Sequence, residues 1–236
     1  MRSIPSGDRT RRCLSEMLGT YLLVFLGPGS VVLGAYLGLS SMASLVFIAG
    51  VFGGTVAGAI LLLGRFSGAN INPAVTVGST IAGTSGRGLL LPYLAFQLSG
   101  ALLAGLTLRA VFGNLASSTS LGSTKLAAGV SPVEGVALEV AGTFLLVASA
   151  LAAGSFLTSP ARQAALVGGT LFLLILLLGP LTGASFNPAR SLGPSLFSGY
   201  FDDQLVYYVG PVLGGVCAGL VFQAVVKLRG RGSDGV

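Results

Sequence analysis

Two stretches of this chain place hydrogen-bonding side chains inside long apolar runs. The first is SGANINPAVTVG, from Ser67 to Gly78, and the second is GASFNPARSLG, from Gly183 to Gly193; both contain Gly-Ala-x-x-Asn-Pro-Ala. An asparagine amide donates and accepts hydrogen bonds, and an arginine guanidinium stays charged and offers five donors in a fixed fork. Arg190 has no acidic neighbour in the sequence. These residue types can bind and orient small polar molecules.

Each Asn-Pro pair is typical of the start of a helix, because Asn is a favoured N-cap and Pro is favoured in the first turn. Helices from Asn72 to Ala82 and from Asn187 to Phe197 would be roughly 15 Å long, about half the bilayer core. Non-helical backbone at membrane depth survives only when it is buried in protein or lines a wet cavity. We therefore expect the preceding Gly-Ala-x-x segments to line a water-filled path.

A surface turn is the alternative interpretation of Asn-Pro, and it would be the better one for a single copy. Two copies at matching places beside apolar spans favour a transport site, since paired interruptions in the two halves of a membrane protein mark such sites.

The composition around these stretches is that of a membrane protein. Of the 236 residues, 53% are hydrophobic and 8% are charged, against roughly 25% charged in an average soluble domain. The first apolar run is long enough for two spans joined near Ser40-Ser41, and no signal-peptide cleavage site follows it. Six spans are therefore predicted in five charge-free runs, which are Met17–Gly64, Gly88–Leu108, Val140–Ala161, Gln163–Ala189 and Gln204–Val226.

The chain also repeats itself. Glu16-Met-Leu-Gly-Thr in the first span recurs as Glu139-Val-Ala-Gly-Thr in the fourth, so each half has three spans and one Asn-Pro-Ala motif. Because three is odd, the second half must enter the membrane from the opposite side. Span glycines such as Gly53-Gly54 and Gly168-Gly169 are expected to form helix-packing faces. We predict one transmembrane channel domain over 1–236, with inverted repeats at about 13–112 and 132–228 and an external loop at 113–131.

The placement of charge predicts the orientation. Ten of the 13 lysines and arginines lie on one side of the six predicted spans, and only Arg109, Lys125 and Arg190 lie elsewhere. Positive charge collects on the cytoplasmic side, so both termini are expected in the cytoplasm of a multi-pass protein of the cell membrane. The net charge of +6 then reflects topology and not a nucleic-acid partner.

The same composition argues against an enzyme, a cofactor or a metal site. The chain has no histidine, seven acidic residues, and two cysteines, Cys13 and Cys217, without metal-ligand spacing. Most hydrolytic and redox chemistry needs a histidine base, a metal or an activated thiolate.

Several motifs together resemble the aquaporin family, the major intrinsic proteins, and most of all its water-channel branch with a selectivity filter that lacks histidine. The resemblance implies six tilted helices and two half-helices in an hourglass, a homotetramer, and passive single-file conduction of water with exclusion of protons and ions. The matching motifs are Glu16-x-x-x-Thr20, Ser67-Gly-Ala-x-x-Asn-Pro-Ala-Val75, Tyr93-Leu-Ala-Phe-Gln-Leu-Ser-Gly-Ala101, Asn187-Pro-Ala-Arg-Ser191 and Val209-Gly-Pro211.

The resemblance also assigns roles to single positions. It places the pore motifs at Asn72, Pro73, Ala74, Asn187, Pro188 and Ala189, and the external selectivity filter at Phe52, Ile175, Ala184 and Arg190. Ile175 stands where strictly water-selective members have histidine, which predicts a less polar and wider constriction. Ser191 and the pair Tyr207-Tyr208 resemble the water channels instead. The predicted permeants are therefore water and small neutral solutes such as glycerol, ammonia or urea. For Arg190, the alternative interpretation is an arginine that snorkels from a helix end towards the membrane surface.

Glu16 and Glu139 are carboxylates in apolar spans, where burial is costly. The resemblance favours a structural role, in which each accepts hydrogen bonds from the irregular backbone before a half-helix. A proton relay would instead make the protein an ion-coupled secondary transporter. A glycerol or small-solute facilitator, and a structural membrane protein with a closed pore, are the remaining alternatives.

Overall fold

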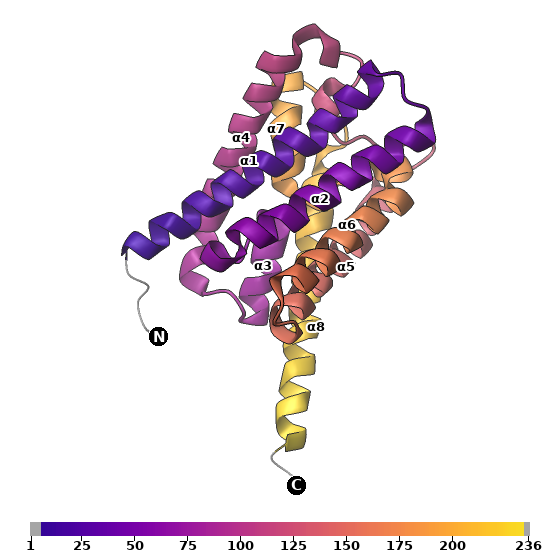
Figure 1. Ribbon diagram of the computed structural model, residues 1–236. Helices are drawn as coiled ribbons and strands as arrows, with labels where there is room; N and C mark the ends of the chain where they lie inside the picture. The colour runs from indigo at the N-terminus through magenta and orange to yellow at the C-terminus, as the bar shows by residue number, and fades with distance from the viewer. Residues whose placement is uncertain (1–5, 234–236) are drawn as a thin grey trace.

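The computed structural model describes residues 6–233 and the side chains of residues 8–228, so Arg2, one of the ten clustered basic residues, lies outside it. The described chain is all-α, as predicted (Figure 1). Six long helices and two short ones make the bundle. They are α1 (Ser6–Tyr36), α2 (Ser41–Ser67), α3 (Pro73–Ala82), α4 (Leu90–Phe112), α5 (Pro132–Phe156), α6 (Pro160–Thr182), α7 (Pro188–Ser198) and α8 (Gln204–Ser233). Short 3-10 turns lie at Arg87–Leu89, Gly113–Ala116 and Ser120–Gly122.

The six long helices are apolar and long enough to cross a membrane, which confirms the six predicted spans. Their outward sides carry large hydrophobic residues such as Leu62, Leu91 and Leu177, which are 67%, 75% and 69% exposed. A soluble protein rarely exposes so large a continuous apolar surface. In a bilayer these side chains contact lipid at no cost.

Span boundaries differ from the prediction, most clearly in the fourth and fifth spans, because counting charge-free residues misplaces helix ends. The fourth span was expected to begin at Val140, yet α5 begins at Pro132, and Glu134 lies in its first turn as part of a capping box with Ser131. A carboxylate at a helix N-terminus is stabilising, so it marks a start and not an interruption. The fifth span was expected to reach Ala189, whereas α6 ends at Thr182 because Gly183 adopts a left-handed cap with φ 75°.

Glycines allow a close helix crossing between α2 and α6. A Cβ added to Gly53 would lie 2.7 Å from the Gly168 carbonyl oxygen, and one added to Gly168 would lie 2.6 Å from the Gly53 carbonyl oxygen. The packing role predicted for these two glycines fits this geometry. Their neighbours Gly54 and Gly169 have nothing within 4 Å of an added Cβ, so they do not pack there.

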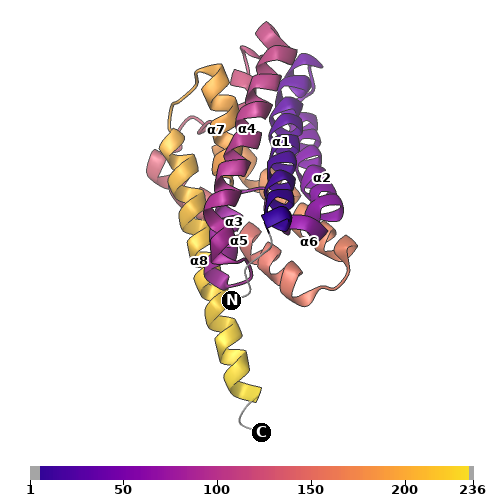
Figure 2. The ribbon, with the colours of Figure 1, turned by 90° about the vertical axis from the view of Figure 1, so that its left-hand side faces the viewer.

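The two half-helices enter the bundle from opposite ends. In Figure 1, α3 lies in the lower half of the molecule and α7 in the upper half, while α8 passes both and extends below the bundle. Viewed from the side, α4, α3 and α8 lie on one flank and α1, α2 and α6 on the other (Figure 2). The N-termini of α3 and α7 therefore point towards each other at mid-height, as the inverted repeat requires.

Candidate functional site

The centre of the molecule is built from two irregular segments that precede the half-helices. In the first, α2 ends at Ser67 with Gly68 as its C-cap at φ 93°, and Ala69 and Ile71 have φ values of 50° and 46°. The second segment repeats this with Gly183, Ala184 and Phe186 at φ 75°, 45° and 52°. A non-glycine residue in the left-handed region costs of order 1 kcal/mol or more, so the surroundings must hold it there.

Two buried carboxylates hold these segments. Glu16 of α1 accepts hydrogen bonds from the backbone N–H groups of Asn70 and Ile71, with N–O distances of 3.0 and 2.6 Å, and from the Gln97 amide at 2.7 Å. Its side chain is fully buried, and its bonds go to the strained backbone.

Glu139 of α5 does the same for the second segment. It accepts from the backbone N–H groups of Ser185 and Phe186, at 3.0 and 2.7 Å, and from the Thr182 hydroxyl at 2.7 Å. Each carboxylate therefore accepts hydrogen bonds from two backbone N–H groups and one side chain. The two backbone bonds fix turns at membrane depth, where water cannot satisfy those N–H groups.

A pair of tyrosines, which the sequence analysis did not assign to this task, completes the symmetry. The Tyr93 hydroxyl donates to the Ser67 carbonyl oxygen and the Tyr207 hydroxyl donates to the Thr182 carbonyl oxygen, both at 2.8 Å. Each bond satisfies a carbonyl at the end of a span that has no partner further along its helix. Both tyrosines lie in the third span of their half, and this equivalence was the sequence feature from which their shared role could have been predicted.

The two asparagines cap the half-helices and reach across to the opposite repeat. The side-chain oxygen of Asn72 accepts from Ala74 N–H at 2.8 Å, and that of Asn187 accepts from Ala189 N–H at 3.0 Å and Arg190 N–H at 3.3 Å. The Asn72 amide nitrogen donates to Phe186 O at 2.8 Å, and the Asn187 amide nitrogen donates to Ile71 O at 3.1 Å. Each amide thus uses one of its two N–H groups in this crossed pair.

A cavity of about 310 Å³ passes these amides. Its lining combines residues of the two irregular segments with the apolar side chains of Leu23, Val56, Leu146, Val167 and Leu171. A mostly apolar cavity with a limited number of hydrogen-bonding groups suits a small polar molecule. Its polar lining includes Arg12, Ser67, Asn70, Asn72, Ser79, Ser185, Asn187 and Arg190.

Arg190 lies against this cavity and is 3% exposed. Its Nη1 donates to the Gly122 carbonyl oxygen at 2.8 Å, and its Cζ lies 5.0 Å from the centre of the Phe52 ring. Its Nε has no hydrogen-bond partner in the protein. The guanidinium is therefore fixed by a backbone carbonyl and an aromatic ring, with a donor left for a molecule in the cavity.

The loop that supplies Gly122 does more than join the two halves. Gly122 and Leu121 are buried, and the Thr124 hydroxyl lies 3.0 Å from the Ser191 hydroxyl. The sequence predicted an external connection at 113–131 from its Ser, Thr and Gly content, and that composition gave no sign that the loop folds back onto α7.

The other two predicted filter residues lie beside this group but not on the cavity surface. Ile175 and Ala184 are 4% and 3% exposed and belong to the same hydrophobic cluster as Phe52. Leu171, one turn before Ile175 on α6, lines the cavity. The structure therefore brings all four predicted residues into one region, with Phe52 and Arg190 on the cavity wall.

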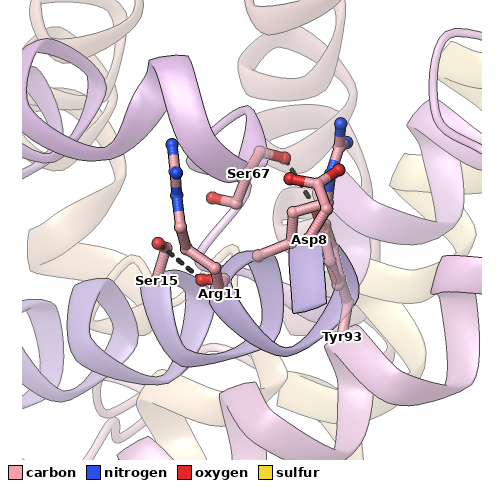
Figure 3. A network of polar contacts seen from close by, with 6 residues as sticks. Asp8, Arg11, Ser15, Ser67 and Tyr93 are labelled. Carbon is pink, nitrogen blue, oxygen red and sulfur yellow. Dashed lines mark hydrogen bonds and ion pairs between the residues drawn. The ribbon is translucent and has the colours of Figure 1, made fainter. Parts of the chain in front are cut away.

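The basic end of the cavity has its own polar network. Arg12 pairs with Asp8 at 2.8 Å, and Arg9 donates to the Gly88 carbonyl oxygen at 3.2 Å. Figure 3 shows Tyr93 and Ser67 near Asp8. The Arg9 bond joins the start of α1 to the segment between α3 and α4.

Comparison with known proteins agrees with this architecture. The family model described as major intrinsic protein matches residues 3–222. The aquaporin TIP2-1 of Arabidopsis thaliana is 38% identical over 226 residues, which cover 90% of this chain and 86% of the relative. The aquaporin AqpM of Methanothermobacter marburgensis is 33% identical over 238 residues, covering 91% of this chain and 96% of the relative.

A solved structure shares the fold. The X-ray structure of the aquaglyceroporin from Plasmodium falciparum superposes with a TM-score of 0.78, covering 92% of this chain and 94% of that one, at 24% sequence identity. At that identity the likeness is evidence for the fold alone. Taken with the family model over nearly the whole chain and the crossed asparagines at its centre, these matches place the chain in the major intrinsic protein family.

Proposed function

We propose that this protein is a passive channel that conducts water in single file, admits small neutral solutes, and excludes protons and ions. The observation that carries the proposal is the crossed pair of Asn72 and Asn187 amides on the cavity wall, each with an N–H left over. A water molecule at that point accepts from both amides, which turns its own hydrogens away from the neighbouring waters. The relatives named aquaporins support the same class of channel.

Electrostatics supports the exclusion of cations. The N-termini of α3 and α7 point at the same place, and each end of a helix carries the equivalent of about half a positive charge. Arg190 adds a full charge on the cavity wall. A hydronium or metal ion must lose hydration where the field is positive, as is described for aquaporin-type pores. Neutral molecules do not meet this barrier.

The proposed selectivity filter consists of Phe52, Ile175, Ala184 and Arg190. Arg190 supplies the charge and the hydrogen-bond donors, while the other three residues are apolar. Phe52 lies on the cavity wall with Arg190, and Ile175 and Ala184 pack behind it. Apolar surface beside one set of donors accommodates a molecule with both polar and alkyl surface. We therefore propose that glycerol, ammonia or urea passes more slowly than water; a facilitator that prefers such solutes is the second candidate.

Glu16 and Glu139 act as structural acceptors in this proposal. Their hydrogen bonds go to the backbone and side chains that shape the two irregular segments, and neither residue is among those that line the cavity. An ion-coupled transporter would need a titrating group exposed to the transport path.

The chain is a multi-pass membrane protein. We further propose that it lies in the cell membrane with both termini in the cytoplasm, and that it forms a homotetramer in which each subunit has its own pore. The clustering of basic residues at the end of the bundle that holds the two termini supports this orientation.

Stopped-flow light scattering on proteoliposomes tests the proposal. An osmotic step should shrink vesicles that contain the protein several-fold faster than empty vesicles, with slower glycerol entry and no proton leak to an internal pH dye. Shrinkage at the rate of empty vesicles would indicate a closed structural protein. Solute accumulation driven by a pH gradient would indicate a coupled transporter.

The Arg190→Leu variant tests the charge barrier in the same assay. We expect proton leak to rise by an order of magnitude or more, since a unit charge at ~4 Å and an effective dielectric constant of ~20 contributes about 4 kcal/mol. Arg109→Leu is the matched control, because Arg109 is an exposed arginine near the same end of the bundle and is outside the cavity lining. Equal leak in both variants would rule out Arg190 as the barrier.

A further inference from the structure

The position of the Arg190 guanidinium depends on a turn of the connecting loop that is itself strained. Ser120, Leu121 and Gly122 lie in succession in the left-handed region, with φ values of 48°, 56° and 72°. Residues other than glycine persist in this region only where the surrounding structure holds them. The Gly122 carbonyl, which accepts the hydrogen bond from Arg190, therefore stays in place only while both ends of the turn are anchored.

The first end of the turn is anchored by apolar packing. Leu121 is 1% exposed and belongs to a hydrophobic cluster that includes Val32 of α1 and Leu108 of α4. A Cβ added to Gly122 would lie 2.5 Å from the carbonyl oxygen of Pro28, which is also in α1. The turn is therefore pressed against α1 and α4, and this end needs no polar contact.

The second end of the turn is anchored by polar contacts, and Gln204, the first residue of α8, lies at their centre. Its side chain is 5% exposed. Its Oε1 accepts a hydrogen bond from the Ser195 hydroxyl of α7 at 3.0 Å, and its Nε2 is shared between the carbonyl oxygens of Thr124 and Asp202 at 3.4 and 3.5 Å. Carbonyl oxygens only accept hydrogen bonds, so the NH2 group of the amide must face them and its oxygen must face the serine.

Gln204 differs from the other polar contacts at this end because it joins three elements. The Thr124 hydroxyl lies 3.0 Å from the Ser191 hydroxyl, and the Ser123 hydroxyl lies 3.1 Å from the Ser198 hydroxyl. Those two contacts join the loop to the half-helix α7. Gln204 belongs to α8, so its amide fixes both the loop and α7 to a membrane-spanning helix.

We propose that Gln204 is a positioning residue for the selectivity of the channel. By anchoring the strained turn, it keeps the Gly122 carbonyl where that oxygen holds the Arg190 guanidinium against the cavity wall. The inference rests on the proposed function, because it concerns the same path. Gln204 is not among the residues that line the cavity, so it acts through the turn. Without its amide the turn relaxes, Arg190 loses its acceptor, and the guanidinium instead binds molecules in the path.

The Gln204→Met variant tests this in proteoliposomes, because methionine keeps the length of the side chain and removes both polar groups. A guanidinium released from the wall obstructs the path, so water permeability should fall several-fold. Glycerol permeability should fall further, because glycerol is wider. The Ser195→Ala variant removes the donor to the amide oxygen and should cause a smaller change in the same direction, which provides a second measurement with a milder substitution.

The matched control is Gln223→Met. Gln223 is a second glutamine of α8, and its Nε2 donates to the Ile81 carbonyl oxygen in the last turn of α3 at 3.2 Å. The control therefore removes a comparable bond between α8 and the other half-helix, far from Arg190 in the structure. It should keep both permeabilities of the wild type, whatever it does to thermal stability.

A double variant shows whether Gln204 acts through Arg190. If it does, Arg190→Leu/Gln204→Met should have the same permeabilities as Arg190→Leu alone. Hydrogen exchange provides a readout that does not depend on conduction. Backbone amides of residues 120–125 should exchange faster in Gln204→Met than in the wild type, and at the wild-type rate in Gln223→Met.

Three results would overturn the proposal. They are wild-type permeabilities in Gln204→Met, an equal loss in the Gln223→Met control, and a further loss when Gln204→Met is added to Arg190→Leu. Wild-type vesicles without water flow would contradict the channel proposal itself. The exchange of residues 120–125 would then still show whether Gln204 anchors the turn, so the two failures are distinguishable.

Discussion

At the scale of single residues, small side chains behind the cavity wall decide how much room the wall leaves. Gly27 of α1 lies directly behind the Phe52 ring, and a Cβ added there would collide with the ring atoms Cε1 and Cζ. Phe52 can therefore occupy its place, 5.0 Å from the Arg190 guanidinium carbon, only because residue 27 has no side chain. Gly27 is a positioning residue for the proposed filter.

The Gly27→Ala variant should push the Phe52 ring towards Arg190 and narrow the path. Because glycerol is wider than water, we expect glycerol permeability to fall several-fold and water permeability to fall less. Gly54→Ala is the matched control, since a Cβ added to Gly54 meets nothing within 4 Å. The measurement is stopped-flow swelling with each solute in proteoliposomes. An equal effect of the two variants on the glycerol-to-water ratio would contradict the role given to Gly27.

At the scale of elements, the irregular segments depend on helices distant in sequence. Glu139 accepts hydrogen bonds from three donors before α7, at Thr182, Ser185 and Phe186, and the last of these residues has positive φ. The half-helix itself is capped by Asn187. The position of α7 therefore depends on its own N-cap and on a carboxylate that belongs to α5.

The Glu139→Ala variant should leave those three donors without a partner, at about 1–3 kcal/mol each. For a chain of this size, a loss of about 3 kcal/mol lowers the Tm by about 6 °C or more. Glu139→Gln retains one acceptor oxygen and should fall between the variant and the wild type, while Glu134→Gln, an exposed site, should change the Tm little. Thermal unfolding in detergent measures this. Unchanged Tm values together with lost pH-driven transport would favour a proton relay instead.

At the scale of the whole molecule, the inverted repeat places equivalent elements of the two halves on opposite sides of the membrane. The basic residues, in contrast, are not distributed equally between the two sides. Basic residues gather at the end of the bundle from which α1 starts and beyond which α8 extends (Figure 1). The fold by itself allows either orientation, and the charge distribution selects one of them.

Both termini should therefore be cytoplasmic. Epitope tags at the two ends should be cleaved by an added protease in inside-out vesicles and protected in right-side-out vesicles of the expressing cells. A tag that is cleaved in right-side-out vesicles would contradict the orientation. The loop at residues 113–131 serves as the internal comparison. The protease should cleave it in right-side-out vesicles and leave it intact in inside-out vesicles.

The sequence alone determined the features that depend on local chemistry. Apolar runs identified the six spans, Asn-Pro located the starts of both half-helices, and the repeated Glu16 and Glu139 motifs showed the inverted repeat. These features follow from helix capping, proline geometry and the cost of placing charge in lipid, which act over a few residues. Charge counting misplaced the start of the fourth span, because it excluded the first turn of α5, where Glu134 caps the helix.

Only the tertiary structure decided the contacts that join distant parts of the chain. The crossed amide bonds connect residues 114 and 116 positions apart, and Arg190 bonds to Gly122, which is 68 positions away in a loop of unremarkable composition. The placement of Phe52 against Gly27, and of Gln204 beside Ser195 and Thr124, likewise depends on which helices pack together. Such pairings arise from the packing of whole helices, so no local pattern encodes them, and they set the shape and charge of the path.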